Sequence, residues 1–306
     1  MNIVTLLPSA TEIVCALGLQ EQIVGVSHSC NFPETIKKLP AVTSTRVPYQ
    51  DSSDVIDNFV RDHLQNNAAL YDLDIQTLNE VRPDVVVSQT LCDVCAVSTG
   101  DVVAAIYGLD SRPRLIDLQP NTLDDVYGDI LRVAAALGRD STAASLLDEL
   151  KARQHAIASR TARIAKNDRP RVAFLEWLLP PFCGGHWNPE LVELAGGIDL
   201  LGNPGRPSAT LSWDRVAASD PDVVVLACCG FDVERALEDV RLLAGNDQWQ
   251  NMRAVQNGEI YLVDGDAYFA RPGPRLIDGL EMLAHALHPD IHPPAPSGGC
   301  VKLDSS

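Results

Sequence analysis

The sequence predicts an α/β protein of two lobes, each built around a largely parallel sheet. Short apolar runs alternate with helical segments along most of the 306 residues. The run PDVVV occurs at 83–87 and again at 221–225, so the second half of the chain partly repeats the first. The stretch between the halves, 121–170, has helical composition rich in Ala, Leu, Arg and Lys.

The first lobe opens with an apolar strand over 3–7, which Pro8 is expected to end. Ser9 and Glu12 then fit an S-x-x-E capping box, which satisfies free backbone amides at the start of a helix. A second strand is predicted at 23–27 and an amphipathic helix at 53–67. The first PDVVV run, with no alternation of polar residues, is typical of a parallel strand buried on both faces.

Two helices are predicted between the lobes, at 122–137 and at about 141–165. At 1.5 Å per residue the second would be roughly 37 Å long, which suits a rigid strut between two lobes. The second lobe restarts with the strand RVAFLEW, and the Pro-rich end of the chain shows no periodicity. We therefore expect a first lobe over 1–120, linking helices over 121–169, a second lobe over 170–288 and a poorly ordered tail over 289–306.

The formal net charge of −17 makes nucleic acid and anionic membrane surfaces poor partners for this chain. No apolar run approaches the roughly 20 residues that span a bilayer, so membrane insertion is not expected. The first residues lack the basic start of a secretory signal. Eight cysteines are too sparse for a disulfide scaffold. These observations favour reduced thiols and a cytoplasmic protein, or a periplasmic one whose leader was removed.

Ligands of parallel α/β sheets bind beyond the carboxyl ends of the strands, and cysteines gather in those segments here. Cys92 and Cys95 form a C-x-x-C pair directly after the first PDVVV strand. Such a pair can fill two positions on Zn²⁺, or bind another thiophilic ion, with further ligands from elsewhere. Reduced thiols packed under a loop, or a redox pair, remain open. The candidate metal ligands are Cys30, Cys92, Cys95, Cys183 and His186.

Aromatic side chains cluster after strands of the second lobe, although the chain is only 5% aromatic. Such platforms suit a large planar ligand, and the alternative is that they cap the ends of the sheet. The residues are Trp177, Phe182, Trp187, Tyr268 and Phe269. No set of nucleophile, base and orienting residue can be assembled, so the chain is not expected to be an enzyme.

The order of these motifs resembles the substrate-binding proteins of iron-siderophore and cobalamin ABC importers, the class with one helical backbone. The resemblance rests on the strand followed by PSATE, on IVGVS followed by a Cys and a Pro, on the PDVVV runs and on the long helix. It covers about residues 2–288. It implies two Rossmann-like lobes joined by a single long backbone helix, with the ligand cleft between the lobes.

Within that family the chain is similar to the cobalamin-binding group, because DAYFARPGPR at 266–275 looks like its ligand loop in the second lobe. The resemblance implies a cobalamin or related corrinoid as ligand. Cobalt accepts an imidazole or thiolate as axial ligand, so His28, His186 or a Cys is a candidate. The expected contacts are Ser9, His28, Cys30, Phe32, Cys92, Cys95, Trp177, Phe182, Cys183, His186, Trp187, Tyr268, Phe269 and Arg271.

The chain departs from the importer pattern where such proteins carry one exposed Glu on each lobe for docking to a permease. The resemblance puts these positions on Gln76 and Asp214, so one carboxylate is absent and the other shorter. Docking to an ABC permease is therefore left open. The alternatives to a corrinoid binder are a protein that holds a ferric siderophore or a thiophilic metal ion, and a cytoplasmic corrinoid-handling enzyme that uses its thiols.

Overall fold

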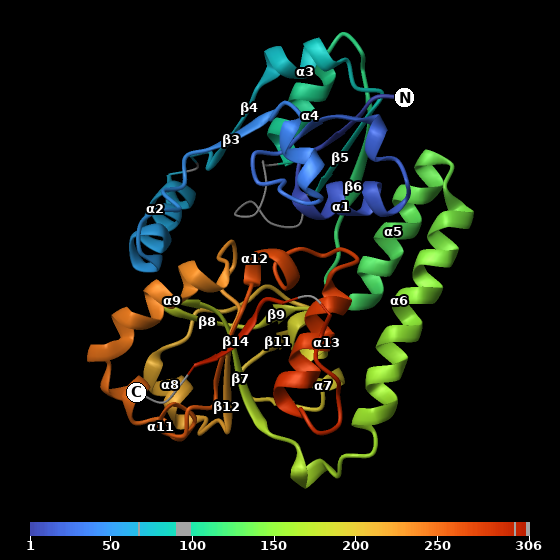
Figure 1. Ribbon diagram of the computed structural model, residues 1–306. Coiled ribbons are helices and arrows are strands. Elements are labelled where there is room, and N and C mark those ends of the chain that lie inside the picture. Colours follow the sequence, from blue (N-terminus) through green and yellow to red (C-terminus); the bar gives the residue numbers. More distant parts are fainter. Residues whose placement is uncertain (67, 90–98, 297, 304–306) are drawn as a thin grey trace. The chain divides into compact units, whose positions relative to one another are not determined.

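The computed structural model describes residues 1–66, 68–89, 99–296 and 298–303, and the chain divides into two compact units (Figure 1). The first unit comprises 1–51, 55–120 and 124–147, and the second comprises 52–54, 121–123 and 148–306. The boundary at 147/148 falls inside helix α6 (Asp140–Thr161), so this one 22-residue helix runs from the first unit into the second. The predicted pair of α/β lobes is confirmed.

The first unit is built on a parallel sheet with strand order β2-β1-β5-β6. The central strand β5 is buried at every position, as the unbroken apolar run predicts. A separate antiparallel ribbon joins β3 and β4. The strands are β1 (Ile3–Thr5), β2 (Ile23–Val26), β3 (Thr43–Thr45), β4 (Tyr71–Leu73), β5 (Val85–Gln89) and β6 (Arg114–Leu118), and the helices are α1 (Pro8–Ala16), α2 (Ser53–Gln65), α3 (Ile75–Val81), α4 (Thr99–Gly108) and α5 (Leu123–Leu137).

The second unit has a mixed sheet of order β10-β7-β12-β13-β14, with β8 added to β7. Helices α7 and α13 pack together on one face, and α8, α9 and α11 lie on the other (Figure 1). The strands are β7 (Arg171–Leu178), β8 (Pro181–Cys183), β9 (Gly185–His186), β10 (Ile198–Asp199), β11 (Asn203–Pro204), β12 (Val223–Leu226), β13 (Ile260–Val263) and β14 (Cys300–Leu303). The helices are α7 (Asn188–Leu194), α8 (Trp213–Ala218), α9 (Val233–Leu242), α10 (Asp247–Gln250), α11 (Arg253–Gln256), α12 (Gly265–Tyr268) and α13 (Leu276–Leu287).

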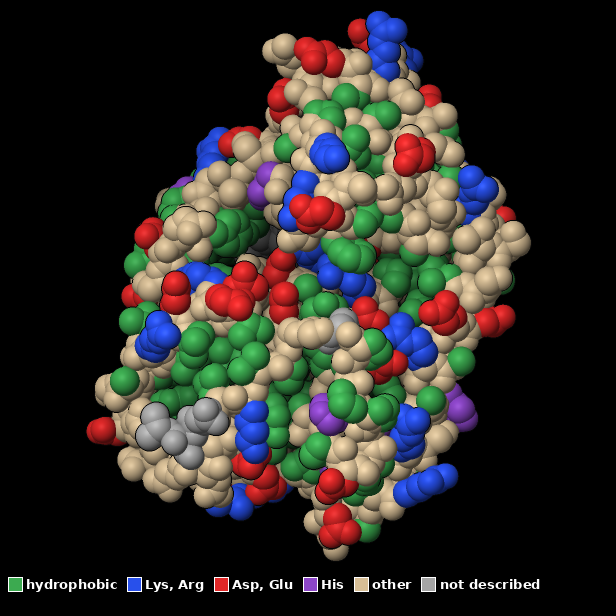
Figure 2. All heavy atoms as spheres, in the orientation of Figure 1, with side chains coloured by type: hydrophobic (Ala, Val, Ile, Leu, Met, Phe, Trp, Pro, Cys, Tyr) green, Lys and Arg blue, Asp and Glu red, His purple; other side chains and the backbone are tan. Residues whose placement is uncertain are grey.

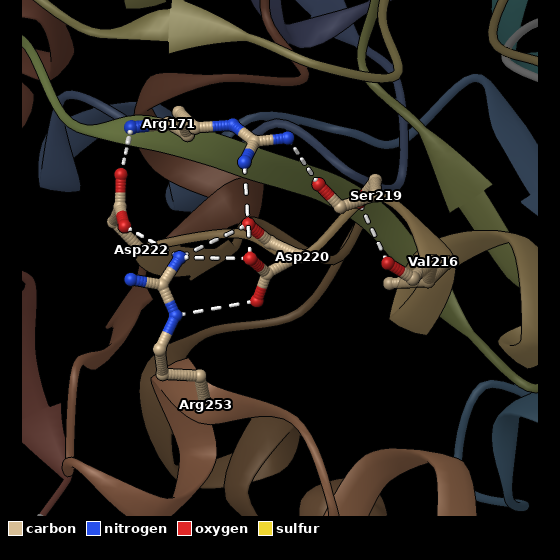
Figure 3. Close-up of polar contacts among 6 residues, drawn as sticks. All are labelled: Arg171, Val216, Ser219, Asp220, Asp222 and Arg253. Atoms are coloured by element: carbon tan, nitrogen blue, oxygen red, sulfur yellow. Dashed lines mark hydrogen bonds and ion pairs between the residues drawn. The ribbon is translucent and has the colours of Figure 1, made fainter.

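The amino ends of β7 and β12 are fastened by a charged cluster (Figure 3). The backbone N–H of Arg171 donates to Asp222 at 2.8 Å, and the guanidinium of Arg253 contacts Asp222 at 2.8 Å and Asp220 at 3.1 Å. Both arginines are nearly half exposed, so water and salt weaken these pairs and each contributes little to stability. The cluster occupies the amino edge, which leaves the carboxyl edge of the sheet for loops that bear function.

Two local expectations are wrong. Helix α1 begins at Pro8, with Leu7 as N-cap and no side-chain cap. Proline suits the first helical position because its φ is already helical and it has no N–H to satisfy. Ser9 therefore lies two residues after the N-cap position and cannot serve as the cap. The tail is also not wholly irregular, because β14 pairs antiparallel with the free edge of β13. Four residues after a Pro-rich stretch are too few to show a periodicity.

The surface reflects the acidic composition of the chain. Asp and Glu side chains are spread over the face in Figure 2 and are interspersed with Lys and Arg. Among the described residues, no helix combines the length and the apolar character that a membrane crossing requires.

Candidate functional site

In the first unit, the predicted contact His28 follows β2, and hydrogen bonds and a ring contact hold its side chain. Its ring Nδ1 lies 2.7 Å from Thr43 Oγ1, and its backbone N–H donates to the same oxygen at 3.0 Å. The imidazole stacks on Tyr71 of β4, with ring centroids 5.7 Å apart. The other ring nitrogen, Nε2, is buried and has no hydrogen-bond partner in the described part of the chain. Burial lowers the pKa of His28, which keeps the ring neutral near pH 7.

Three neighbouring predicted contacts differ in exposure. Ser9 is 1% exposed in the first turn of α1, and its Oγ has no partner among the described residues. Cys30 is buried, with Sγ 3.0 Å from Thr11 Oγ1, which lies 2.6 Å from Thr5 Oγ1. Phe32 is 45% exposed. The Cys30 thiol is therefore packed against a buried hydroxyl chain, an arrangement that needs no metal to explain it.

The C-x-x-C pair, Cys92 and Cys95, lies outside the described residues. In the ranges that the structure does describe, no group of three or more His, Cys, Asp or Glu side chains is placed to hold a metal ion. None of the described cysteines forms a disulfide. Thiolate metal binding by this pair therefore stays a prediction.

In the second unit, His186 ends the short strand β9 with a left-handed backbone, φ 51°. Its backbone N–H donates to the Arg206 carbonyl at 2.6 Å. This approach requires Gly185 beside it, because a Cβ there would lie 2.3 Å from the Ser208 nitrogen. The His186 ring stacks on Trp187 with centroids 5.3 Å apart, and its Nε2 is buried without a partner in the described chain. Burial lowers the pKa of His186 as well.

Glu176 and Cys183 lie next to this strand. Glu176 accepts hydrogen bonds from the Gly185 N–H at 2.6 Å and the Asn188 amide at 2.8 Å, and burial raises its pKa. Cys183 is 1% exposed, and its Sγ accepts a hydrogen bond from the Ala209 N–H at 3.3 Å. Burial raises the pKa of this thiol, so it is protonated at neutral pH.

The two tryptophans among the predicted contacts are anchored at their polar ends. Trp177 donates from Nε1 to the Ser53 carbonyl at 3.1 Å and lies 5.0 Å from the Phe231 ring. Trp187 donates from Nε1 to the Phe269 carbonyl at 2.9 Å. Phe182 of β8 is half-buried. Both indole N–H groups are therefore used within the unit, and only ring faces and edges remain for a ligand.

The residues of the segment 268–271 differ in their burial and in their contacts. Tyr268 is half-buried, with the Arg275 guanidinium 5.3 Å from its ring centroid. Phe269 is 1% exposed and packs on Phe174 at 5.5 Å, so it lies in the core. Arg271 is 4% exposed, and its guanidinium forms an ion pair with Asp266 at 2.5 Å. The positive charge of Arg271 is therefore largely neutralised within the unit.

Sequence reasoning missed Thr43, Tyr71 and Asp266, which hold the predicted residues His28 and Arg271 in place. Thr43 and Tyr71 lie on neighbouring strands of the β3–β4 ribbon. The alternation of AVTSTRV was the available signal for that ribbon. The pairing of two strands with a long insertion between them could not be read from the pattern.

Comparison with known proteins identifies the family. The profile of the family described as periplasmic binding protein matches residues 3–267. The chain belongs to the periplasmic binding protein family. This confirms the resemblance to importer substrate-binding proteins, and it confirms a binding protein rather than an enzyme.

The relatives are distant in sequence but similar over nearly the whole chain. A substrate-binding lipoprotein of an ABC transporter from Bacillus subtilis is 23% identical, and the match covers 94% of this chain and 80% of the relative. The vitamin B12-binding protein of Vibrio cholerae is 22% identical, with 92% of this chain and 87% of the relative covered.

Solved structures show the same fold. A periplasmic heme-binding protein from Pseudomonas aeruginosa aligns with a TM-score of 0.76 at 20% identity, covering 99% of this chain and 98% of that one. The periplasmic vitamin B12-binding protein of Vibrio cholerae aligns with a TM-score of 0.67 at 21% identity, covering 94% and 96%. The chain is thus a substrate-binding protein of the ABC-importer type.

The prediction of a cytoplasmic protein is wrong. The relatives are periplasmic proteins or a lipoprotein, which points to the periplasm or the cell exterior. The prediction relied on the first residues and on the small number of cysteines. A small number of cysteines does not indicate the compartment, because a protein of this size has an apolar core large enough to be stable without disulfides. The proposal of a cytoplasmic thiol enzyme falls with it.

Proposed function

We propose that the protein binds cobalamin or a related corrinoid for an ABC importer. The observation that carries the proposal is the pair of imidazoles described above. His28 in the first unit and His186 in the second each have a buried Nε2 without a partner among the described residues. Both rings are kept neutral by burial. A neutral imidazole nitrogen is a suitable axial ligand for cobalt.

The proposed contacts are those predicted residues whose side chains are at least partly exposed. In the first unit they are the half-buried His28 and the exposed Phe32, while buried Ser9 lies beneath the surface. In the second unit they are His186 and the rings of Phe182 and Tyr268. Buried Trp187, Phe269 and Cys183 support this surface from within. Aromatic faces with few charged groups suit the large corrin ring and its neutral amide side chains.

The charge state of Arg271 favours a corrinoid over a ferric siderophore. An anionic chelate needs free cationic anchors, whereas the Arg271 guanidinium is buried and paired with Asp266. The same argument disfavours heme, which carries two carboxylates. Replacing Asp266 by Asn would release the charge of Arg271. We expect Asp266→Asn to raise the affinity for an anionic ferric siderophore while leaving corrinoid affinity within about threefold.

The experiment is a titration of the purified protein with hydroxocobalamin, hemin and a ferric hydroxamate siderophore, followed by visible absorption and calorimetry. Saturable binding of one corrinoid per chain is expected, with weaker binding of the two other ligands. Metal analysis of the protein as purified covers the thiophilic-ion alternative. Tight hemin or siderophore binding without corrinoid binding would contradict the proposal.

For the importer, we propose that exposed side chains on α3 and α8 contact the permease. Asp214 on α8 is exposed and accepts a hydrogen bond from Gln248 at 2.9 Å. Gln76 on α3 is exposed and donates to Glu80 at 3.0 Å. Glu80, one helical turn further, keeps a carboxylate on the same face of α3 as Gln76. Each unit therefore offers a carboxylate near the position that the resemblance implies.

A further inference from the structure

The hydroxyl of Thr43 uses its one donor and both of its acceptor positions in hydrogen bonds. Its oxygen accepts the backbone N–H of His28 at 3.0 Å and lies 2.7 Å from the ring Nδ1, while its hydrogen points to Ser27 Oγ at 3.2 Å. A threonine hydroxyl has one hydrogen and two acceptor lone pairs. Because its hydrogen is directed to Ser27, the contact with Nδ1 requires that Nδ1 carry the proton and donate it to Thr43.

The tautomer of His28 follows from this assignment. A neutral imidazole has a single N–H, so a proton on Nδ1 leaves a bare lone pair on Nε2. That nitrogen is buried and has no partner among the described residues. An unsatisfied buried acceptor costs about 1–3 kcal/mol, so its presence calls for an explanation. A ligand that offers an electron-pair acceptor to Nε2 provides one.

The plane of the ring is fixed as well as its tautomer. His28 stacks on Tyr71 with an interplanar angle of 29°, and Tyr71 Oη lies 3.0 Å from Tyr49 Oη. In the β3–β4 ribbon Tyr71 pairs with Thr45, two residues after Thr43. The ribbon therefore holds the imidazole through its edge at Thr43 and through its face at Tyr71. Histidine ligands of metals are oriented in this way, by a hydrogen bond at the nitrogen that does not bind the metal.

We infer that His28 Nε2 is an axial ligand to the cobalt of the bound corrinoid, and that Thr43 and Ser27 are the positioning residues that hold its ligating tautomer. The inference rests on the proposed function and narrows its ligand class to corrinoids with an exchangeable axial position. In the binding step, a water molecule leaves cobalt(III) and the Nε2 lone pair forms the new bond. No electron is transferred and no proton is released from the neutral ring.

The test uses diaquacobinamide, a corrinoid that lacks its own nucleotide base, and follows its visible spectrum during titration of the protein. Wild type should show the spectral shift of water replaced by imidazole. His28→Ala should bind more weakly without that shift, and added free imidazole should restore it. Thr43→Val, which removes the acceptor of Nδ1–H, should weaken binding by about 10–100-fold, whereas Thr43→Ser should stay within about threefold of wild type.

Ser27→Ala separates positioning from general stability. Without the Ser27 acceptor, the Thr43 hydroxyl is free to donate to Nδ1, and the ring then adopts the Nε2–H tautomer, which has no lone pair for cobalt. We expect a loss of the shift at low cobinamide concentration, although His28 and Thr43 are both intact. Thr45→Val is the matched control on the same strand, since Thr45 Oγ1 accepts the Val47 N–H at 3.0 Å and is not part of the chain from Ser27 through Thr43 to His28. It should keep both shift and affinity.

The two proposals fail in different ways. If wild type binds no corrinoid, the proposed function fails. If wild type binds cobinamide but His28→Ala leaves the spectrum unchanged, the proposed function stands and axial ligation by His28 is overturned. Weaker binding by His28→Ala with no spectral difference in the wild-type complex would identify Nε2 as an acceptor for an N–H of the ligand, and would equally overturn ligation.

Discussion

Arg153 of α6 forms a two-pronged ion pair with Glu281 of α13, at 2.9 Å from Nε and 2.8 Å from Nη2. The same Nη2 contacts Asp278 of α13 at 2.5 Å. All three side chains are less than a third exposed. The hydrogen bond to Glu281, followed by that to Asp278, raises the pKa of Arg153, although partial burial acts in the opposite direction. The second-unit half of α6 is thus tied to α13 by a shared cation.

Replacing Arg153 by Met should lower the free energy of unfolding by about 1–3 kcal/mol. The substitution keeps the apolar stem but leaves two neighbouring carboxylates without their common partner. Urea denaturation would measure the change, and Arg163→Met at an exposed position beyond α6 serves as the control. A loss for Arg153→Met no larger than for the control would show that the ion pair contributes nothing.

The sequence was sufficient where a residue pattern alone determines an element. The helices expected at 122–137 and 141–165 are α5 (Leu123–Leu137) and α6 (Asp140–Thr161), and the two PDVVV runs are β5 and β12. Strands buried on both faces need continuous apolar residues, and helices need a helical period, so both leave a trace in the sequence. The lobes followed from the order of these elements.

The candidate site was less accessible to sequence reasoning because its geometry depends on contacts between distant segments. Trp177 lies at the carboxyl end of β7 and Phe269 lies beyond β13, as expected of ligand contacts. However, the indole of Trp177 is bonded to Ser53, and Phe269 lies against Phe174. Position after a strand does not reveal in which direction a side chain points. The role of Thr43 depends on three hydrogen bonds whose partners are up to 16 residues apart, which no local pattern encodes.

Phe269 should behave as a core residue. It is 1% exposed, so Phe269→Ala should lower the free energy of unfolding by about 3–5 kcal/mol through lost burial and a cavity. Phe269→Leu retains most of the volume and should cost much less while leaving corrinoid affinity within about threefold. Denaturation and titration of both variants test this. A large loss of affinity in a stable Phe269→Leu protein would instead make the ring a direct ligand contact.

Asp214 should matter for the importer and not for the ligand. Its carboxylate is exposed on α8, so reversing its charge with Asp214→Arg should leave stability and corrinoid affinity nearly unchanged. Association with the permease in detergent, or transport in proteoliposomes, should fall by tenfold or more, because a cation would replace the carboxylate at the proposed contact. The exposed Glu234 on α9 supplies the control, Glu234→Arg. Equal loss in both variants would indicate a general charge effect.

His292 should make the second unit less stable in acid. The residue is 2% exposed, its Nε2 lies 3.4 Å from Thr161 Oγ1, and its Nδ1 has no partner among the described residues. Burial lowers its pKa below the usual 6.5, with smaller contributions from Arg160, His288 and His285. Protonation would place a charge in a buried site beside an arginine and two further histidines.

The direction of the pH effect follows from this lowered pKa. The unfolded chain takes up the proton of His292 near pH 6.5, whereas the folded chain takes it up only at lower pH. Between those two values the unfolded state carries more protons, so the free energy of unfolding falls as the pH falls, by at most about 1.4 kcal/mol per pH unit for this group. Urea denaturation of wild type and His292→Gln from pH 7.5 to 5 measures the two slopes. The variant should have the shallower slope whatever its stability at pH 7.5. Equal slopes in wild type and His292→Gln would contradict the assignment.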